Sequence, residues 1–414
     1  MSTIISGSSP SVTFSDGSVQ TTAFTTPVSI ANGGTGATTL AGANIATTNS
    51  STQSITSVNT FGFKNRLING DMRIDQRNAG ASVTPTSGQY CLDRFVTFSS
   101  QASKYSIQQN AGSVTPPTGF SNYLGVTSLS AYSIGSGDYF AMAQNIEYCN
   151  MADLAWGTAN AKQITLSFWV YSSLTGTFGG ALVNGVSSYS YPFTYSISTA
   201  NTWTYITITI SGPTSGSWST TYNAPGLKVF IGLGIGSTYS GTAGSWSSNY
   251  YLSATGATSV VGTNGATFYI TGVQLEVGSQ ATSFDFRDYG RELMMCQRYY
   301  ETSAPIGTAP ADGVVSFEAV GANANSSGGT WFAYYWITYK VTKRVAAVTL
   351  NLYGVSGNWQ WNNAGSFTTY SSTSYPGDGT GIQSTGGITV IGYGAGSQYQ
   401  AYLARGTWAV SAEL

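Results

Sequence analysis

The sequence predicts an all-β protein. Glycine occurs 51 times among 414 residues, and Ser, Thr and Tyr fill long runs between the glycines, as in proteins with many turns. Charged residues make up only 7% of the chain, so the helix formers Glu and Lys are scarce. The predicted architecture is an N-terminal segment, a large jelly-roll-type β-sandwich, one short linking helix and a C-terminal β-sandwich tip. Their expected bounds are 1–60, 61–285, 286–301 and 302–414.

The large sandwich is predicted from runs in which polar and apolar residues alternate, or in which β-branched and aromatic residues gather, between Gly, Ser and Pro turns. The one helix expected among these runs is a short one at 150–157. Many strands with so little helix are typical of a jelly-roll sandwich. The expected strands are 90–98, 137–148, 163–172, 202–210, 226–235 and 266–277.

The run "FRDYGRELMMCQRYYE" breaks the β pattern at 286–301. An apolar residue recurs there every three or four positions, which gives one apolar helix face. Asp288 and Arg291 stand three residues apart, and we expect them to pair on the other face. The apolar positions are Tyr289, Leu293, Cys296 and Tyr300, and the strands expected after the helix are 330–340, 346–354, 397–406 and 407–414.

The first 60 residues contain a single charged residue, Asp16, and consist mainly of small side chains. The stretch "VTFSDGSVQT" predicts a hairpin that turns at Asp16-Gly17. The segment 30–48 cannot bury enough apolar surface to fold alone. It either orders by packing against copies of itself or serves as a flexible linker.

The net charge of −1 gives no electrostatic attraction for nucleic acid and no reason to expect a membrane surface as partner. The three cysteines form no CxxC pair and no disulfide framework, so we expect them to act as small buried side chains. The N-terminus lacks the features of a secretory signal, and no run approaches the ~18 apolar residues of a membrane helix. The chain is therefore expected to be made in a cytoplasm and to be soluble there.

Catalysis is not expected. The sequence has no histidine, which excludes Ser-His-Asp and Cys-His mechanisms, and between Gln163 and Leu275 its only charged residue is Lys228. Asp71 and Asp75 would lie ~13 Å apart on an extended strand, whereas a glycosidase pair needs about 5–9.5 Å. We expect a non-enzymatic protein without a cofactor. A structural calcium ion held by Asp and backbone carbonyls stays an alternative, although no EF-hand loop is present.

Charge is concentrated in two zones, 62–94 and 276–301, which hold 16 of the 31 ionisable residues. The zones open and close the large sandwich, and the two ends of a domain often lie together. We therefore expect them to meet in a mixed-sign network at a domain or subunit boundary, where ion pairs fix orientation more than they stabilise. The expected members are Arg66, Asp71, Arg73, Asp75, Arg77, Asp285, Arg287, Asp288, Arg291 and Arg298.

The sequence contains 28 tyrosines and 10 tryptophans, many of them in Gly/Ser-rich surroundings. Flat rings beside hydroxyl and amide donors are suited to stacking on sugar faces. Trp169, Trp203 and Trp336 lie inside strand patterns, and we expect these three to pack between sheets. For tryptophans in loops, packing and sugar contact both stay open. The candidates for glycan contact are Trp246, Tyr250, Tyr251, Trp359 and Trp361.

Several segments resemble those of bacteriophage tail-fibre and virion structural proteins. "VTFSDGSVQTTAF" and "IANGGTGATTLAGAN" look like N-terminal attachment segments of tail fibres. "NRLINGDMRIDQRNAG" resembles the opening of the large domain in such proteins, and "ATFYITGVQLEVGSQATSFDFRDYGRELMMCQRYYE" resembles its closing segment. "KVTKRVAAVTLNLYG" and the terminal "SAEL" resemble their C-terminal portions.

The resemblance covers most of the chain and implies a carbohydrate-binding-module-like jelly roll, a β-rich tip, homotrimers and no catalytic residues. With the aromatic residues, it predicts a receptor-binding protein of the virion tail that attaches to host-surface polysaccharide. Residues 1–60 would fasten it to other virion proteins, and neither nucleic acid nor membrane insertion is expected. The alternatives are a structural virion component, such as a capsid decoration or tail adaptor, and a polysaccharide depolymerase.

Overall fold

A computed structural model describes residues 4–5, 12–13, 19–20, 63–324, 331–354, 359–363, 366–369, 372–374, 383–394 and 401–414. The chain divides into two units, Met1–Gly62 and Phe63–Leu414. The first unit contains a three-stranded antiparallel sheet, in which β2 and β3 are the arms of the predicted hairpin. The segment 30–48 lies outside the described residues. The strands are β1 (Ile4–Ile5), β2 (Val12–Thr13) and β3 (Val19–Gln20).

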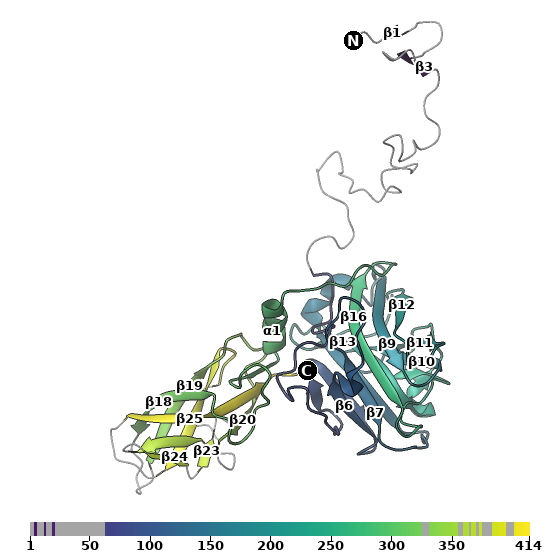
Figure 1. The fold of residues 1–414 in the computed structure, drawn as a ribbon. Helices are drawn as coiled ribbons and strands as arrows, with labels where there is room; N and C mark the ends of the chain where they lie inside the picture. The colour runs from purple at the N-terminus through teal and green to yellow at the C-terminus, as the bar shows by residue number, and fades with distance from the viewer. Residues whose placement is uncertain are drawn as a thin grey trace. The chain divides into compact units, whose positions relative to one another are not determined.

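The second unit begins with a β-sandwich of two antiparallel sheets (Figure 1). The six-stranded sheet has the order β11-β10-β13-β8-β5-β4, and the five-stranded sheet has the order β12-β9-β16-β7-β6. The prediction of an all-β fold with a large sandwich is confirmed. The strands are β4 (Tyr90–Leu92), β5 (Phe95–Ser99), β6 (Tyr105–Gln109), β7 (Leu124–Ser128), β8 (Tyr139–Glu147), β9 (Ile164–Ser172), β10 (Gly176–Asn184), β11 (Ser190–Ile197), β12 (Thr204–Ile210), β13 (Pro225–Ile235) and β16 (Thr267–Val277), with a small parallel pair, β14 (Ser240–Gly241) and β15 (Ser253–Ala254).

The core of this sandwich lies between the two sheets. In β9 the alternating side chains Leu166 and Phe168 face the core at 0% exposure, while Trp169 and Tyr171 face outward. Burying each such Leu or Phe contributes about 1.5–3 kcal/mol, so this face fixes the register of the strand. Other large residues of the same core are Phe140, Phe178, Leu182, Leu233, Phe268 and Leu275.

The short helix expected at 150–157 is replaced by two 3₁₀ turns, η3 (Tyr148–Asn150) and η4 (Ala152–Leu154). Ala155 follows η4 in the left-handed conformation, with φ of 51°, and Gly157 also has a positive φ of 85°. An α-helix cannot continue through such residues, so the helical pattern is cut after one turn.

One α-helix occurs in the described residues, α1 (Tyr289–Gln297), and none of the helices there is long and apolar enough to cross a membrane. It is shorter than the predicted 286–301, because Tyr300 already belongs to β17 (Tyr300–Thr302). The expected side-chain pair of Asp288 and Arg291 is a helix cap instead. The Asp288 carboxylate accepts the backbone N–H of Arg291 at 3.0 Å, which satisfies a free donor of the first turn.

The C-terminal sheet has the order β22-β21-β25-β18-β19-β24-β23, and β17 and β20 also pair with β25. β25 is one strand across 401–411, where the sequence predicts a break at Gly406-Thr407. A Cβ on Gly406 would lie 2.2 Å from Cδ1 of Trp359, so this glycine makes room for a core ring and does not form a turn. The strands are β18 (Phe317–Ala324), β19 (Trp331–Thr338), β20 (Thr349–Tyr353), β21 (Gln360–Asn363), β22 (Ser366–Thr369), β23 (Ser372–Ser374), β24 (Gly387–Gly394) and β25 (Ala401–Ser411).

A second hydrophobic core belongs to these C-terminal strands. The first half of β25 pairs with β18, and its second half pairs with β17 and β20. The strands that pair with the two halves of β25 contribute to one hydrophobic cluster, which is separate from the core of the large sandwich. Its buried members include Tyr335, Ile337, Leu350, Trp359, Ile388, Val390, Trp408 and Val410.

Candidate functional site

Trp246 lies in a group of five aromatic residues on the large sandwich, which we call the Trp246 cluster. Its ring centroid is 5.6 Å from that of Tyr189, and the two rings are parallel within 5°. Trp156 and Trp218 stand edge-on to it, with centroids at 5.4 and 5.8 Å. Tyr191 completes the cluster at 5.3 Å. Edge-on and offset-stacked contacts are the arrangements that aromatic rings favour.

Separate segments of the large sandwich supply these rings. Tyr189 and Tyr191 flank Ser190, the first residue of β11, and Trp246 comes from the segment between β14 and β15. Ser190 and Ser247 exchange backbone hydrogen bonds at 2.9 and 2.8 Å. This isolated bridge holds the Trp246 segment against β11, so the rings are positioned by the sheet.

Ring edges of the cluster are anchored to backbone and hydroxyl groups. The indole N–H of Trp246 donates to the Ser211 carbonyl at 2.8 Å, and that of Trp218 donates to the Ser215 carbonyl at 3.2 Å. The Tyr189 hydroxyl lies 3.1 Å from the Ser215 hydroxyl. Trp218, Trp246 and Tyr189 are all half-buried. Partly exposed rings with serine hydroxyls beside them can stack on a sugar ring and hydrogen-bond its edge.

The other predicted tyrosines contact different residues. Tyr250 is half-buried and stands edge-on to Tyr239 at 6.2 Å, and burial raises the pKa of its hydroxyl. Tyr251 is half-buried against Gly241, where an added Cβ would lie 2.3 Å from its Cδ2. Neither ring belongs to the Trp246 cluster.

The prediction that Trp359 contacts a glycan is wrong. Its side chain is 0% exposed in the C-terminal core, its indole N–H donates to the Thr407 carbonyl at 3.1 Å, and its ring packs on Phe317. The "GNWQWNN" context resembles a surface loop, but Trp359 directly precedes β21 and its ring fills the core. Trp361 lies in β21, opposite Ala404 of β25, and its side chain is outside the described part of the structure.

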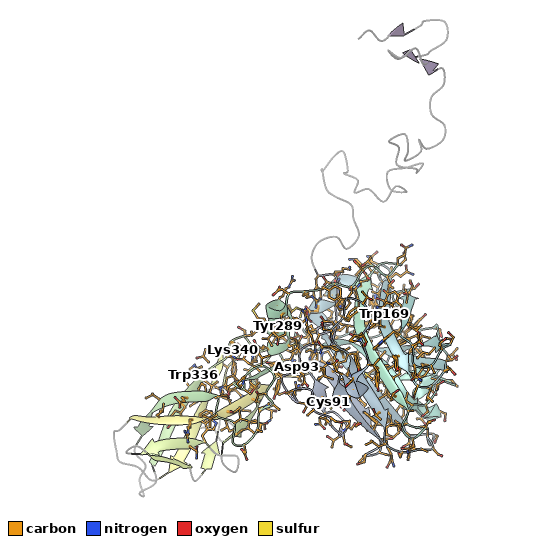
Figure 2. All side chains as sticks on the ribbon, viewed as in Figure 1. Cys91, Asp93, Trp169, Tyr289, Trp336 and Lys340 are labelled. Atoms are coloured by element: carbon orange, nitrogen blue, oxygen red, sulfur yellow. The ribbon has the colours of Figure 1, made fainter. Side chains whose placement is uncertain are left out.

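Three tryptophans expected between sheets are not there. Trp169 is half-buried on the outer face of the five-stranded sheet and packs against Tyr205, which is 43% exposed. Trp203 is also on that face, with its indole N–H on the Thr115 carbonyl at 2.8 Å. Trp336 is 48% exposed on β19 (Figure 2). The alternation in "QITLSFWVYS" indicates the outward position of Trp169, because it places Trp169 on the other face of the strand from Leu166 and Phe168.

The two charged zones meet around Arg287, which is 8% exposed. Its guanidinium lies 3.3 Å from the Asp285 carboxylate and 3.2 Å from that of Glu292, and it also donates to the Asn65 carbonyl. Arg73, from the first zone, donates to the backbone carbonyl of Arg287. The segment that opens the sandwich is thus tied to the one that closes it.

Other predicted charges have different partners. Arg66 forms a two-pronged pair with Asp153, at 2.7 Å for both bonds. Arg73 lies 2.9 Å from Asp71, and burial raises the pKa of the Asp71 carboxyl. Asp75 forms no ion pair among the described residues. Its carboxylate accepts backbone N–H groups of the turn that follows it, those of Arg77, Asn78 and Gly80.

The remaining predicted residues lie at a junction that we call the seam, between the large sandwich and the C-terminal strands. Arg77 pairs with Glu413 at 2.6 Å, and Arg94 pairs with the other oxygen of the same carboxylate. Arg298 holds Glu147 through two bonds of 3.0 Å. Sequence reasoning missed Glu413 and Glu147, because neither lies in a charged zone. The seam residues are Arg77, Arg94, Glu147, Arg298, Tyr299, Glu301, Lys343, Arg344 and Glu413.

The described residues include three cysteines and no cluster of metal-ligating side chains. No group of three or more His, Cys, Asp or Glu side chains there could hold a metal ion. Cys91, Cys149 and Cys296 are free thiols, and burial raises the pKa of Cys91 to about 12 and that of Cys296 well above its usual value. Such buried thiols are protonated and inert at neutral pH.

Comparison with known proteins gives a distant likeness of fold. No protein-family model and no curated protein matches the sequence. Among solved structures, the enzymatically active domain of tailspike protein 4 of bacteriophage CBA120 is 12% identical, with a TM-score of 0.30 over 52% of this chain and 21% of that one. The match therefore spans about a fifth of the length of that solved domain.

For two further solved structures, the match with this chain extends over nearly their whole length. A putative sugar binding protein from Bacteroides thetaiotaomicron is 13% identical, with a TM-score of 0.31, over 52% of this chain and 100% of that one. A family 11 carbohydrate-binding module of a Clostridium thermocellum cellulase is 14% identical, with a TM-score of 0.24, over 49% and 98%. At these identities the likeness concerns the fold alone.

Proposed function

We propose that this chain is a non-catalytic, saccharide-binding protein of a bacteriophage tail, which attaches the virion to host-surface polysaccharide. The observation that carries the proposal is the Trp246 cluster, in which four partly exposed rings pack around the buried Trp156, with indole hydrogen bonds to backbone carbonyls and a serine hydroxyl at the edge. Lys228 is the only charged residue from 163 to 275, so the surface suits a neutral, hydroxyl-rich ligand.

The phage context of the proposal comes from the sequence resemblance. Residues 1–60 would fasten the chain to other virion proteins, after synthesis in the host cytoplasm. A homotrimer would present three copies of the Trp246 cluster, and linked sites raise the effective concentration of a repeating polysaccharide. Weak stacking at each copy would then add up to firm attachment.

The experiment compares two tryptophan variants of the full chain. Trp246→Leu keeps an apolar side chain in the cluster but removes the flat ring, whereas Trp336→Leu removes a more exposed tryptophan from β19. The wild-type protein and Trp336→Leu should bind purified host polysaccharide and slow phage adsorption to cells, and Trp246→Leu should do neither. Equal binding by both variants, with unchanged melting temperatures, refutes the assignment to Trp246.

A structural virion component is the second candidate, and an exposed apolar face favours it. Val320, Tyr334 and Trp336, on the neighbouring strands β18 and β19, are 71%, 38% and 48% exposed. Exposed apolar patches often mark contacts between proteins. A virion density map that places the chain in the capsid or in a tail adaptor, together with failure to bind glycans, would support this role. Release of reducing sugar from the polysaccharide would instead indicate a depolymerase.

A further inference from the structure

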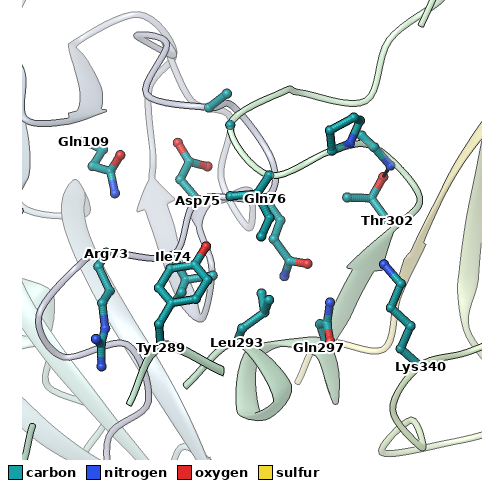
Figure 3. A pocket seen from close by; sticks show the side chains of 15 residues that line it. Arg73, Ile74, Asp75, Gln76, Gln109, Tyr289, Leu293, Gln297, Thr302 and Lys340 are labelled. Atoms are coloured by element: carbon teal, nitrogen blue, oxygen red, sulfur yellow. Dashed lines mark hydrogen bonds between the residues drawn. The ribbon is translucent and has the colours of Figure 1, made fainter. Parts of the chain in front are cut away.

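A cleft of about 310 Å³ lies at the seam (Figure 3). One wall comes from residues 73–79 and Gln109 of the large sandwich, and the other from residues 302–307 and Lys340. Tyr289, Leu293 and Gln297 of α1 form its floor. Ligand pockets in proteins begin at about 300 Å³, so this cleft has room for a small molecule. It shares no residue with the Trp246 cluster.

Two of the three charges in its lining are already compensated. Arg73 lies 2.9 Å from Asp71, and the Asp75 oxygens accept three backbone N–H groups at 2.7–3.2 Å. Lys340 differs. Its backbone N–H donates to Glu301 at 2.9 Å, but no described residue forms a hydrogen bond or ion pair with its ammonium group. The cleft therefore offers one available positive charge and no available carboxylate.

Gln297 adds a neutral polar group to the same lining. The residue is 6% exposed, no described residue forms a hydrogen bond with its side-chain amide, and its side chain borders the cleft. An amide at that position can donate to or accept from a ligand hydroxyl. Figure 3 shows Gln297 and Lys340 at the same side of the cleft, with Leu293 next to Gln297 and Tyr289 beyond Leu293.

We propose that this cleft binds a single acidic sugar unit, a pyranose ring that carries a carboxylate. The carboxylate would pair with the Lys340 ammonium, a ring hydroxyl would meet the Gln297 amide, and the apolar side of the ring would lie over Leu293 and Tyr289. A zwitterionic amino acid fits less well, because Asp75 is occupied and leaves no partner for an ammonium group. The N-terminus of α1 is capped by Asp288 and gives no phosphate site.

The proposal takes its ligand class from the proposed function but concerns a different site. Titration of the full-length protein by calorimetry, with glucuronate, glucose and acetate as probes, tests it. Glucuronate should bind about tenfold more tightly than either glucose or acetate, because only it offers both the charge and the ring. Lys340→Gln and Gln297→Leu should each weaken glucuronate binding by about tenfold, since each removes one polar contact.

Matched controls separate this site from the Trp246 cluster. Lys162→Gln removes a lysine whose side chain is 49% exposed and distant in sequence, and should leave glucuronate affinity unchanged. Trp246→Leu should abolish polysaccharide binding and also leave glucuronate affinity unchanged. Equal affinity for glucuronate and acetate, no glucuronate binding, or no effect of Lys340→Gln would each overturn the proposal. Loss of glucuronate binding in Trp246→Leu alone would move the acidic sugar to the cluster.

Discussion

The guanidinium carbon of Arg94 lies 3.5 Å above the centre of the Tyr299 ring. Arg94 joins β4 to β5 in the large sandwich and is 1% exposed, while Tyr299 leads into the C-terminal strands. The same guanidinium pairs with Glu413 and donates to the Asn145 carbonyl at 2.5 Å. A desolvated cation over an aromatic face is worth about 2 kcal/mol or more, so this contact fixes one sandwich to the next part of the chain.

The first prediction concerns this cation. Arg94→Met should lower the unfolding free energy by about 3–5 kcal/mol, because it removes one partner of a buried pair and leaves the ring and Glu413 without it. Arg291→Met, on the exposed side of α1, should change it by no more than about 0.5 kcal/mol. Urea unfolding monitored by fluorescence measures both. If Arg94→Met is as stable as Arg291→Met, the contacts of Arg94 at the seam do not contribute to the unfolding free energy.

The second prediction concerns Lys343 and Glu301, whose side chains are both 0% exposed and 2.6 Å apart. Glu301→Gln should cost about 3–5 kcal/mol, because it leaves the Lys343 charge buried without a counter-ion. Replacing both charges, as Glu301→Gln with Lys343→Met, should cost less than the sum of the single changes. A double-mutant cycle from thermal unfolding measures the coupling. Additive losses would show that the two charges do not interact.

The third prediction is a pH dependence set by Asp93. Burial raises the pKa of this carboxyl to about 7, against the lowering influence of Arg77 and of hydrogen bonds from Gln76. A raised folded-state pKa means that the folded protein holds the proton longer than the unfolded chain. Stability from this group is therefore complete below pH ~4 and is lost as pH rises to about 7. Asp93→Asn should flatten that part of the stability profile.

Asp138 gives a control of opposite sign. Burial acts to raise its pKa, but hydrogen bonds from the Gly135 N–H and the hydroxyls of Ser100 and Tyr132 outweigh burial and lower it. Its contribution to stability is present above the ordinary carboxyl pKa and is lost in acid. Asp138→Asn should therefore change only the acidic part of the curve of stability against pH. Chemical unfolding at a series of pH values separates the two groups. If the loss of stability as the pH rises to about 7 is the same in Asp93→Asn as in the wild type, Asp93 is not the group that causes it.

The fourth prediction concerns Gly157, which has φ of 85° and lies against Trp218. An added Cβ would stand 2.6 Å from Cδ1 of that ring, so Gly157→Ala should displace Trp218 and weaken polysaccharide binding. Gly313→Ala introduces the same backbone strain, at φ of 84°, with no atom within 4 Å. Both should lose about 1–2 kcal/mol of stability, but only Gly157→Ala should lose binding. Polysaccharide co-sedimentation makes the comparison.

Strands with a clear alternation could be predicted from the sequence, and several others could not. The predicted runs 163–172 and 266–277 match β9 and β16 closely, because one face of each must be apolar. β10 was missed, since its "GTFGGALVN" is rich in glycine. A Cβ on Gly180 would lie 2.3 Å from the Phe230 carbonyl, so a glycine is needed there because the neighbouring strand β13 lies so close. Such a contact cannot be recognised from the local sequence.

The candidate site was also predictable only in part, because its contacts join segments that are far apart in the sequence. The polar, glycine-rich context of Trp246 pointed to an accessible ring, but similar surroundings misassigned Trp359, whose burial depends on Gly406 of a distant strand. The partners of Trp246 come from segments up to 90 residues away, Trp156 among them. Likewise, Arg77 gave no hint of Glu413, because only the folded chain brings the C-terminal residues back to the large sandwich.

The most direct test of saccharide binding at the Trp246 cluster follows the indole N–H signals of the 10 tryptophans by NMR during titration with oligosaccharides from the host polysaccharide. The signals of Trp246 and Trp218 should shift in a saturable way, while those of Trp169 and Trp336 stay in place. Saturable shifts of Trp169 without any change at Trp246 would contradict this account and place the sugar on the outer face of the five-stranded sheet.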